Sequence, residues 1–124
     1  MTFALWMILV AILLPVLTTG LAKWGVSGMD NHQPRVWQDT LVGWRRRADW
    51  AHRNHFEALP GFAAAVLVAT MAHAPVVPLN ALAGVWVFFR VAYTVCYITD
   101  RATLRSVMWA GAFFCVIVLF AVSI

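Results

Sequence analysis

Arginine, asparagine and glutamate side chains share one face of a helix that the sequence predicts. Arg53, Asn54 and Glu57 stand at i, i+1 and i+4, and Trp50, three residues before Arg53, continues this face. A guanidinium, an amide and a carboxylate in this pattern suit a small ligand that carries carboxylates and an ammonium group. Glu57 is the only glutamate in the chain, and the uncharged segment 61–70 follows almost directly. A carboxylate at the edge of hydrocarbon is costly, so we expect it to have a function.

A second polar face is predicted on the third apolar segment. It carries, at i, i+3, i+4 and i+7, the residues Arg90, Tyr93, Thr94 and Tyr97. A lone arginine deep in a membrane span needs a carboxylate partner, and Glu57 is the only acid at comparable depth. We therefore predict an ion pair between Glu57 and Arg90 that joins the two helices. For Arg90 alone a purely structural role is the simpler interpretation, because such a pair fixes helix packing.

The composition is that of an integral membrane protein. Of the 124 residues, 63% are hydrophobic and 11% are charged, and the mean hydropathy is +0.80. A soluble domain of this length has too little interior to bury so much apolar surface. The net charge of +4 comes from basic residues that flank apolar segments, which favours a membrane surface over nucleic acid. The two cysteines lie inside apolar runs and predict neither a disulfide framework nor a metal site.

Four apolar segments are long enough to cross a bilayer. They predict an all-α, integral membrane four-helix bundle that forms a single domain over 1–124, with approximate spans at 3–22, 44–72, 79–99 and 106–123. The first segment lacks the basic start and the small-residue cleavage site of a signal peptide, so we expect it to be retained. The one long loop follows it and is rich in turn-forming residues; its length allows partial order, and we assign no helix to it.

Basic residues gather on one side of the predicted membrane. Every lysine and arginine except Arg90 lies in or beside the long loop or the short link 100–105. The positive-inside rule places this side in the cytoplasm and both termini on the opposite side. A solvated basic rim would explain arginines in loops, but it does not require Arg53, Tyr93 and Tyr97 on inward faces. We therefore favour a site for an anionic ligand over a basic rim.

Two stretches resemble signatures of the MAPEG family, the membrane-associated proteins in eicosanoid and glutathione metabolism. The stretch AHRNHFEALP at 51–60 has the Arg-Asn pair, the glutamate three residues past the asparagine and the proline of the family's second helix. The stretch RVAYTVCYITDRATLRS at 90–106 is similar to the family's third-helix segment with its terminal Arg-Ser. Length, four spans and sidedness agree with the family, so the resemblance covers essentially the whole chain.

The resemblance implies a homotrimer that binds glutathione, as a co-substrate, between neighbouring subunits near the cytoplasmic surface. The residues it assigns to glutathione are Lys23, Arg53, Asn54, Glu57, Tyr93 and Tyr97. The catalytic position is Arg105, with Ser106 beside it. A thiol with a pKa of about 8.5 is a poor nucleophile at neutral pH, and a permanently charged guanidinium stabilises its thiolate. The second substrate would be a hydrophobic electrophile or a lipid hydroperoxide from the bilayer.

The sequence departs from the family's pattern at two positions, and two other functions compete with this interpretation. Trp50 replaces an arginine of some members and Trp109 replaces a tyrosine, which weakens the case for prostaglandin or leukotriene synthesis. The first alternative is a non-catalytic member of the same fold that binds lipids or a partner, which would have no need of Arg105. The second is a small drug/proton exporter, which requires an acid in the first helix, and 3–21 contains none.

Overall fold

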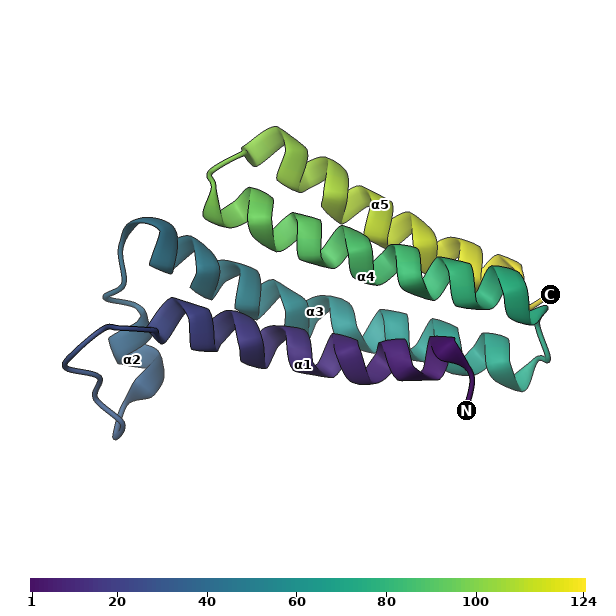
Figure 1. The fold of residues 1–124 in the computed structure, drawn as a ribbon, viewed down its shortest axis with the longest axis horizontal. Coiled ribbons are helices and arrows are strands. Elements are labelled where there is room, and N and C mark those ends of the chain that lie inside the picture. Colours follow the sequence, from purple (N-terminus) through teal and green to yellow (C-terminus); the bar gives the residue numbers. More distant parts are fainter.

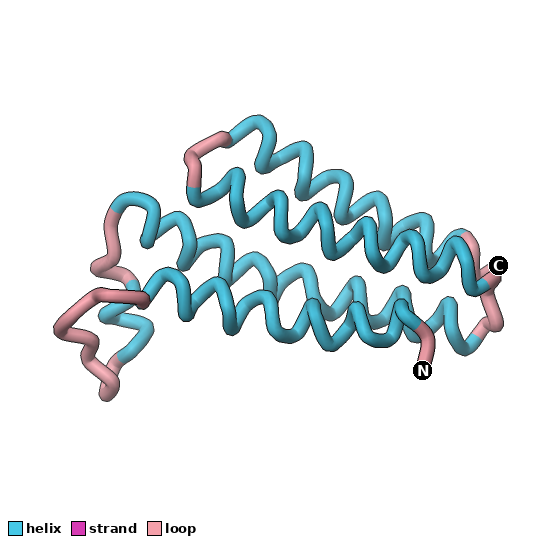
Figure 2. Tube along the Cα trace, viewed as in Figure 1, coloured by secondary structure: helices cyan, strands magenta, loops and turns pink.

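The computed structural model describes all 124 residues, and they fold into helices without any strand. The five helices are α1 (Phe3–Lys23), α2 (Pro34–Gln38), α3 (Gly43–Met71), α4 (Val76–Ile98) and α5 (Ala102–Ala121). The four long helices run side by side, with α1 against α3 and α4 against α5, and loops close both ends (Figures 1 and 2). Both termini lie at the end opposite to α2 (Figure 1). The expected all-α architecture is confirmed, whereas the expected four helices omit α2.

The short helix α2 forms within the segment that we predicted to be a loop. It begins at Pro34, whose fixed φ and missing N–H suit the first position of a helix. The side-chain amide of Gln38 then donates to Thr19 Oγ1 of α1 (3.1 Å) and to Asp49 Oδ1 of α3 (2.8 Å). Gln38 and Asp49 are buried. Because these tertiary bonds hold α2 in place, local sequence signals did not predict it.

Two helices begin three or more residues before the spans predicted for them. α4 begins at Val76, because Pro78 falls in its first turn, where a missing N–H is not needed. α5 begins at Ala102, because Asp100 takes a left-handed conformation (φ 59°) and completes the turn in a few residues. Arg105 therefore lies in the first turn of α5, rather than in the link before it.

The outer surface of the molecule is apolar. Only 23 of the 124 residues are buried, and large side chains such as Leu17, Phe88 and Phe114 are each more than 60% exposed. Such a surface would aggregate in water and suits hydrocarbon. Length and composition qualify α1, α4 and α5 as membrane-crossing helices. The polar first half of α3 keeps it out of that group, although a fourth span was predicted there.

The apolar core lies along the second half of α3, away from α2. The rings of Phe62 and Trp86 stack with centroids 3.8 Å apart and planes 6° from parallel. Fully buried alanines, including Ala65, Ala69 and Ala83, let the backbones of α1, α3 and α4 approach closely. This packing fixes how α3 and α4 face each other, and so it positions the polar half of α3 against α4.

Candidate functional site

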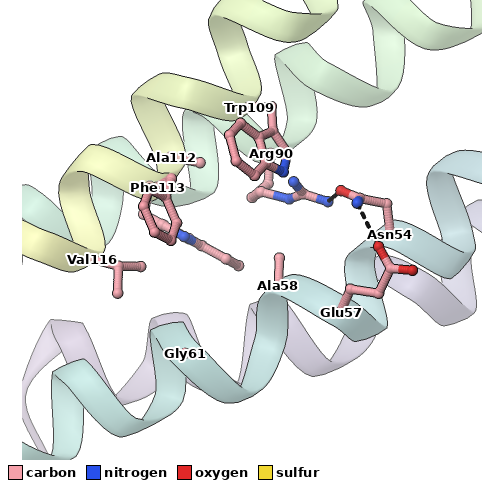
Figure 3. Close-up of a pocket in the computed structure, with 10 residues that line it drawn as sticks. Asn54, Glu57, Ala58, Gly61, Arg90, Trp109, Ala112, Phe113 and Val116 are labelled. Carbon is pink, nitrogen blue, oxygen red and sulfur yellow. Dashed lines mark hydrogen bonds between the residues drawn. The ribbon is translucent and has the colours of Figure 1, made fainter.

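Arg90 is fully buried and donates hydrogen bonds to two side chains of α3. Its Nη2 donates to Asn54 Oδ1 at 3.0 Å, and its Nε and Nη2 lie 3.3 and 3.0 Å from His55 Nδ1. Asn54 Nδ2 in turn donates to Glu57 Oε2 at 2.7 Å (Figure 3). The network thus runs from the guanidinium of α4, through an amide, to the carboxylate of α3.

The predicted direct ion pair between Glu57 and Arg90 is wrong. All three ion pairs of the chain involve Asp39 or Asp49, and none involves Glu57. Asn54 stands between the two charges, because its amide offers an acceptor to the guanidinium and a donor to the carboxylate. Glu57 Oε1 accepts no hydrogen bond from the chain, which leaves it free to bind a donor.

His55, for which no role was expected from the sequence, is only 2% exposed. Because a guanidinium only donates, Nδ1 of His55 must accept, so the imidazole is neutral and carries its proton on Nε2. Nε2 then donates to Thr94 Oγ1 at 2.8 Å, and that hydroxyl donates to the carbonyl of Arg90 at 3.1 Å. The bonds close a ring that fixes the guanidinium. No sequence pattern singles out His55, because its environment depends on how α4 packs against α3.

A column of rings and cations extends from Arg90 toward the end that carries α2. The guanidinium carbon of Arg90 lies 4.4 Å from the ring centroid of Tyr93, which meets Tyr97 edge to face at 5.5 Å. The guanidinium carbon of Arg105 lies 4.6 Å from the centroid of Tyr97, and Trp50 flanks Tyr97 at 6.2 Å. Cation–π contact holds Arg105 without using its N–H donors, and these make no hydrogen bond or ion pair within the chain.

Arg53 does not join Asn54 and Glu57, contrary to our prediction. Its Nη2 donates to Asp39 Oδ1 at 2.8 Å. Its Nε lies 3.0 Å from Asp49 Oδ2, close enough for an ion pair but poorly aligned for a hydrogen bond. Two carboxylates therefore balance the charge of Arg53. It lines a separate polar cavity of about 390 Å³, bounded also by Arg35, Gln38, Asp49, His52 and Phe56.

The arginine triplet at 45–47 binds the ends of three different helices. In order, its side chains donate to the carbonyls of Ala22 in α1 (3.2 Å), Gln38 in α2 (3.2 Å) and Ile98 in α4 (3.1 Å). The carbonyls at a helix end lack partners within the helix and carry partial negative charge, so cations stabilise them. Each of these three arginines therefore has an acceptor inside the protein.

Lys23 and Ser106 stand apart from the network. Lys23 is the last residue of α1, and its side-chain ammonium makes no hydrogen bond or ion pair within the chain. Ser106 is exposed, and its hydroxyl donates to the carbonyl of Ala102 in its own helix at 3.2 Å. The roles assigned to these two residues remain predictions.

A cavity of about 270 Å³ opens between α3, α4 and α5 beside the network (Figure 3). Its polar end is formed by Asn54, Glu57 and Arg90. Its remaining walls are small or apolar side chains, namely Ala58, Gly61, Trp86, Trp109, Ala112, Phe113 and Val116. An apolar pocket with a few convergent polar groups at one end is typical of a small-molecule site.

Asp39 lies between α2 and α3, outside the membrane-spanning helices, and links the two. It accepts hydrogen bonds from Arg53 (2.8 Å) and Arg46 (3.2 Å). The hydrogen bond from Arg53 is the largest influence and lowers the pKa of Asp39, and Arg46 adds to the effect. Its side chain is 53% exposed, so water screens both pairs and their effect on stability is small.

Apolar helices around a polar network define an integral membrane protein with a site of small-molecule size. The model of the MAPEG family matches residues 3–124, so the chain belongs to the MAPEG family. The resemblance that the motifs indicated is therefore confirmed over essentially the whole chain. Searches among curated proteins and among solved structures gave no match. Membership supports a general role at a membrane in glutathione-related or eicosanoid metabolism.

Proposed function

We propose that this protein is a membrane-bound, glutathione-dependent transferase or peroxidase that acts on hydrophobic electrophiles or lipid hydroperoxides. The observation that carries the proposal is Arg105, whose guanidinium is held over Tyr97 with its N–H donors unused. A guanidinium in this position offers a bound anion both a permanent positive charge and hydrogen-bond donors. Most other arginines of this end already have acceptors or carboxylates of their own.

Glutathione carries an ammonium group, two carboxylates and a thiol, and the network offers complementary groups. Glu57 Oε1 is free to accept a hydrogen bond from the ammonium, while Asn54 fixes the orientation of the carboxylate. The hydroxyl groups of Tyr93 and Tyr97 make no hydrogen bond within the chain, and the rings of these two residues lie between the guanidinium groups of Arg90 and Arg105. In the proposed homotrimer glutathione lies between subunits, and Lys23 binds one of its carboxylates.

Arg105 stabilises the thiolate, and the thiol proton passes to water. In transfer, the sulfur attacks the electrophilic carbon, an S–C bond forms, and the leaving group departs with its electron pair. In peroxide reduction, the sulfur attacks the terminal oxygen, the O–O bond breaks, and the alkoxide takes a proton to become an alcohol. A second glutathione then displaces water from the sulfenic acid and yields the disulfide. We also propose that the end with α2 faces the cytoplasm, where glutathione enters.

Titration of the purified protein with glutathione, followed by the ultraviolet absorbance of the thiolate, tests this function. We expect wild type to form the thiolate at neutral pH and Arg105→Ala to lose most of that absorbance while it still binds glutathione. Arg101→Ala is the matched control, since Arg101 is an exposed cation just before α5 without an ion pair. Binding without a thiolate signal in wild type would instead favour the non-catalytic alternative. No binding would refute the proposal.

A further inference from the structure

We propose that the polar cavity between α2 and α3 binds the headgroup of a zwitterionic phospholipid, with its phosphate on Arg35 and Arg53 and its ammonium group on Asp49. This space, the α2 cavity, has a volume of about 390 Å³. Arg35 and Gln38 of α2 line it together with Asp49, His52, Arg53 and Phe56 of α3. The site does not rest on the proposed function, because neither glutathione nor Arg105 takes part in it.

The α2 cavity lies on a different face of α3 from the network around Arg90. Its residues on α3 stand at positions 49, 52, 53 and 56, whereas the cavity beside the network uses positions 54, 57, 58 and 61. Each set follows the i, i+3, i+4, i+7 pattern of one helical face, and the second set is displaced by five residues. Because a helix has 3.6 residues per turn, this displacement turns the face by roughly 140°. The two cavities are therefore separate sites.

Asp49 supplies the α2 cavity with an acceptor that has no hydrogen bond. The residue is fully buried, and its Oδ1 accepts from Gln38 at 2.8 Å, whereas its Oδ2 accepts no hydrogen bond. Nε of Arg53 lies 3.0 Å from Oδ2 but is poorly aligned for a hydrogen bond. Gln38 Oε1 also accepts nothing within the chain, since only its amide nitrogen is used. A buried acceptor without a donor is costly, so a ligand that donates to Asp49 gains affinity.

Two guanidinium groups supply the α2 cavity with unused donors. Arg35 is exposed, and its side chain makes no hydrogen bond or ion pair within the chain. Arg53 uses Nη2 on Asp39 and Nε on Asp49, which leaves Nη1 without an acceptor. Guanidinium groups bind phosphate oxygens through charge-assisted hydrogen bonds, often in pairs. A phosphate group therefore fits between Arg35 and Arg53.

The balance of charge selects a zwitterion. The positive charges of Arg35 and Arg53 are matched by the carboxylates of Asp49 and of Asp39, which pairs with Arg53. A ligand with a phosphate alone brings negative charge next to two carboxylates and leaves Asp49 Oδ2 without a donor. A ligand with a phosphate and a primary ammonium group satisfies both ends and adds no net charge. A quaternary ammonium group has no N–H to donate, so phosphoethanolamine is favoured over phosphocholine.

The depth of the α2 cavity matches that of phospholipid headgroups. The ring of His52 donates from Nδ1 to the carbonyl of Pro15 at 2.8 Å, about two turns before the end of the membrane-crossing helix α1. The helix α2 lies at this same end (Figure 1). The cavity thus reaches from the membrane surface toward the outer hydrocarbon. Phe56, which is 52% exposed, offers an apolar contact to the acyl chains of a lipid whose headgroup occupies the cavity.

Native mass spectrometry of the protein released from lipid nanodiscs tests the site. The nanodiscs contain equal amounts of phosphatidylethanolamine, phosphatidylcholine and phosphatidylglycerol. We expect wild type to retain phosphatidylethanolamine about fivefold more than either other lipid, and Arg35→Ala to lose most of that excess. Arg35 has no partner within the chain, so its removal should leave thermal unfolding unchanged. Arg101→Ala, which removes an exposed cation at the same end, is the matched control and should behave as wild type.

Asp49→Asn tests the ammonium end of the site. It keeps an acceptor for Gln38 but removes the carboxylate, so the preference for phosphatidylethanolamine over phosphatidylcholine should disappear while both lipids are retained equally. Equal retention of the two lipids by wild type, or stronger retention of phosphatidylglycerol, would overturn the zwitterion. Retention that is unchanged by Arg35→Ala in folded protein would overturn the site itself.

Two competitors distinguish this site from other binding events. Soluble glycerophosphoethanolamine lacks acyl chains and should displace the lipid only weakly, whereas efficient displacement would show that the ligand is not a lipid. Saturating glutathione should leave the retained phosphatidylethanolamine unchanged, and Arg35→Ala should bind glutathione as wild type does. Displacement of the lipid by glutathione would assign the α2 cavity to glutathione and refute the lipid site. Absence of glutathione binding would refute only the proposed function, because the retained lipid is measured without it.

Discussion

Arg90 donates two hydrogen-bonding N–H groups to His55, so the only deeply buried cation of the chain contacts a neutral imidazole rather than a carboxylate. A buried charge without a direct ion pair depends on every hydrogen bond that it makes. The imidazole, the amide of Asn54 and the ring of Tyr93 together take the place of a counterion. Neutral partners therefore stabilise this buried cation in place of a carboxylate.

Replacement of His55 should destabilise the protein. His55→Leu removes the acceptor for Arg90 and the donor for Thr94, and we expect a loss of about 2–4 kcal/mol in the free energy of unfolding. His55→Gln retains an acceptor and a donor and should lose less than half as much. Thermal unfolding of both variants in one detergent measures the difference. Equal stability of His55→Leu and wild type would show that the ring of hydrogen bonds contributes nothing.

Glu57→Gln should separate binding from stability. Glu57 is exposed and reaches Arg90 only through Asn54, so we expect its neutralisation to change the free energy of unfolding by less than about 1 kcal/mol. Loss of a charged hydrogen bond to the ammonium of glutathione should weaken binding by about tenfold or more. Unfolding experiments give the change in the free energy of unfolding, and calorimetric titration gives the change in the Kd for glutathione. A loss of about 3–5 kcal/mol would instead indicate a direct buried ion pair.

The attachment of α2 should weaken in acid. The folded pKa of Asp39 lies below its unfolded value, so its contribution is complete above the unfolded pKa of about 4 and is lost as pH falls through the folded pKa. We expect hydrogen exchange in α2 to accelerate below about pH 4, after correction for intrinsic rates. Asp39→Asn should show exchange modestly faster than wild type at neutral pH, with little further change in acid. Identical pH profiles for the two proteins would contradict this role.

Arg105→Lys should retain part of the thiolate stabilisation. Lysine keeps the positive charge but loses the planar guanidinium that stacks on Tyr97. We expect kcat/KM for a hydrophobic electrophile to fall by roughly tenfold, against a much larger loss in Arg105→Ala. Tyr97→Leu should reproduce the loss of Arg105→Lys, because it removes the ring that positions the guanidinium. Full activity in Tyr97→Leu would mean that this stacking does not position Arg105.

The sequence predicted the long helices well, because long apolar runs and their breakers carry a strong local signal. It also placed Asn54 and Glu57 on a face that meets Arg90, which the helical spacing determines. It failed for α2, whose formation depends on the buried pairing of Gln38 with Asp49. A five-residue helix has no periodicity to detect, and only the packed neighbours explain it.

The errors at the site have a common cause. Helical spacing assigns a side chain to a face, but a long arginine reaches several partners from one position. Arg53 turns to Asp39, which lies in a loop whose path the sequence does not reveal. The pairing of Glu57 with Arg90 was inferred by elimination among acids, and elimination overlooked neutral acceptors such as Asn54 and His55. Neutral partners of buried cations are therefore worth weighing alongside carboxylates.

The three arginines at the start of α3 also bear on the order in which the chain assembles as it leaves the ribosome. The acceptors in α1 and α2 precede the triplet 45–47, so two of the three contacts can form as soon as α3 emerges. The third acceptor, the carbonyl of Ile98, lies 51 residues after Arg47 and exists only once α4 has been synthesised. Until then Arg47 lacks the acceptor that it has in the folded protein. The pair formed by α1 and α3 therefore lacks one of the three arginine contacts until the end of α4 reaches Arg47.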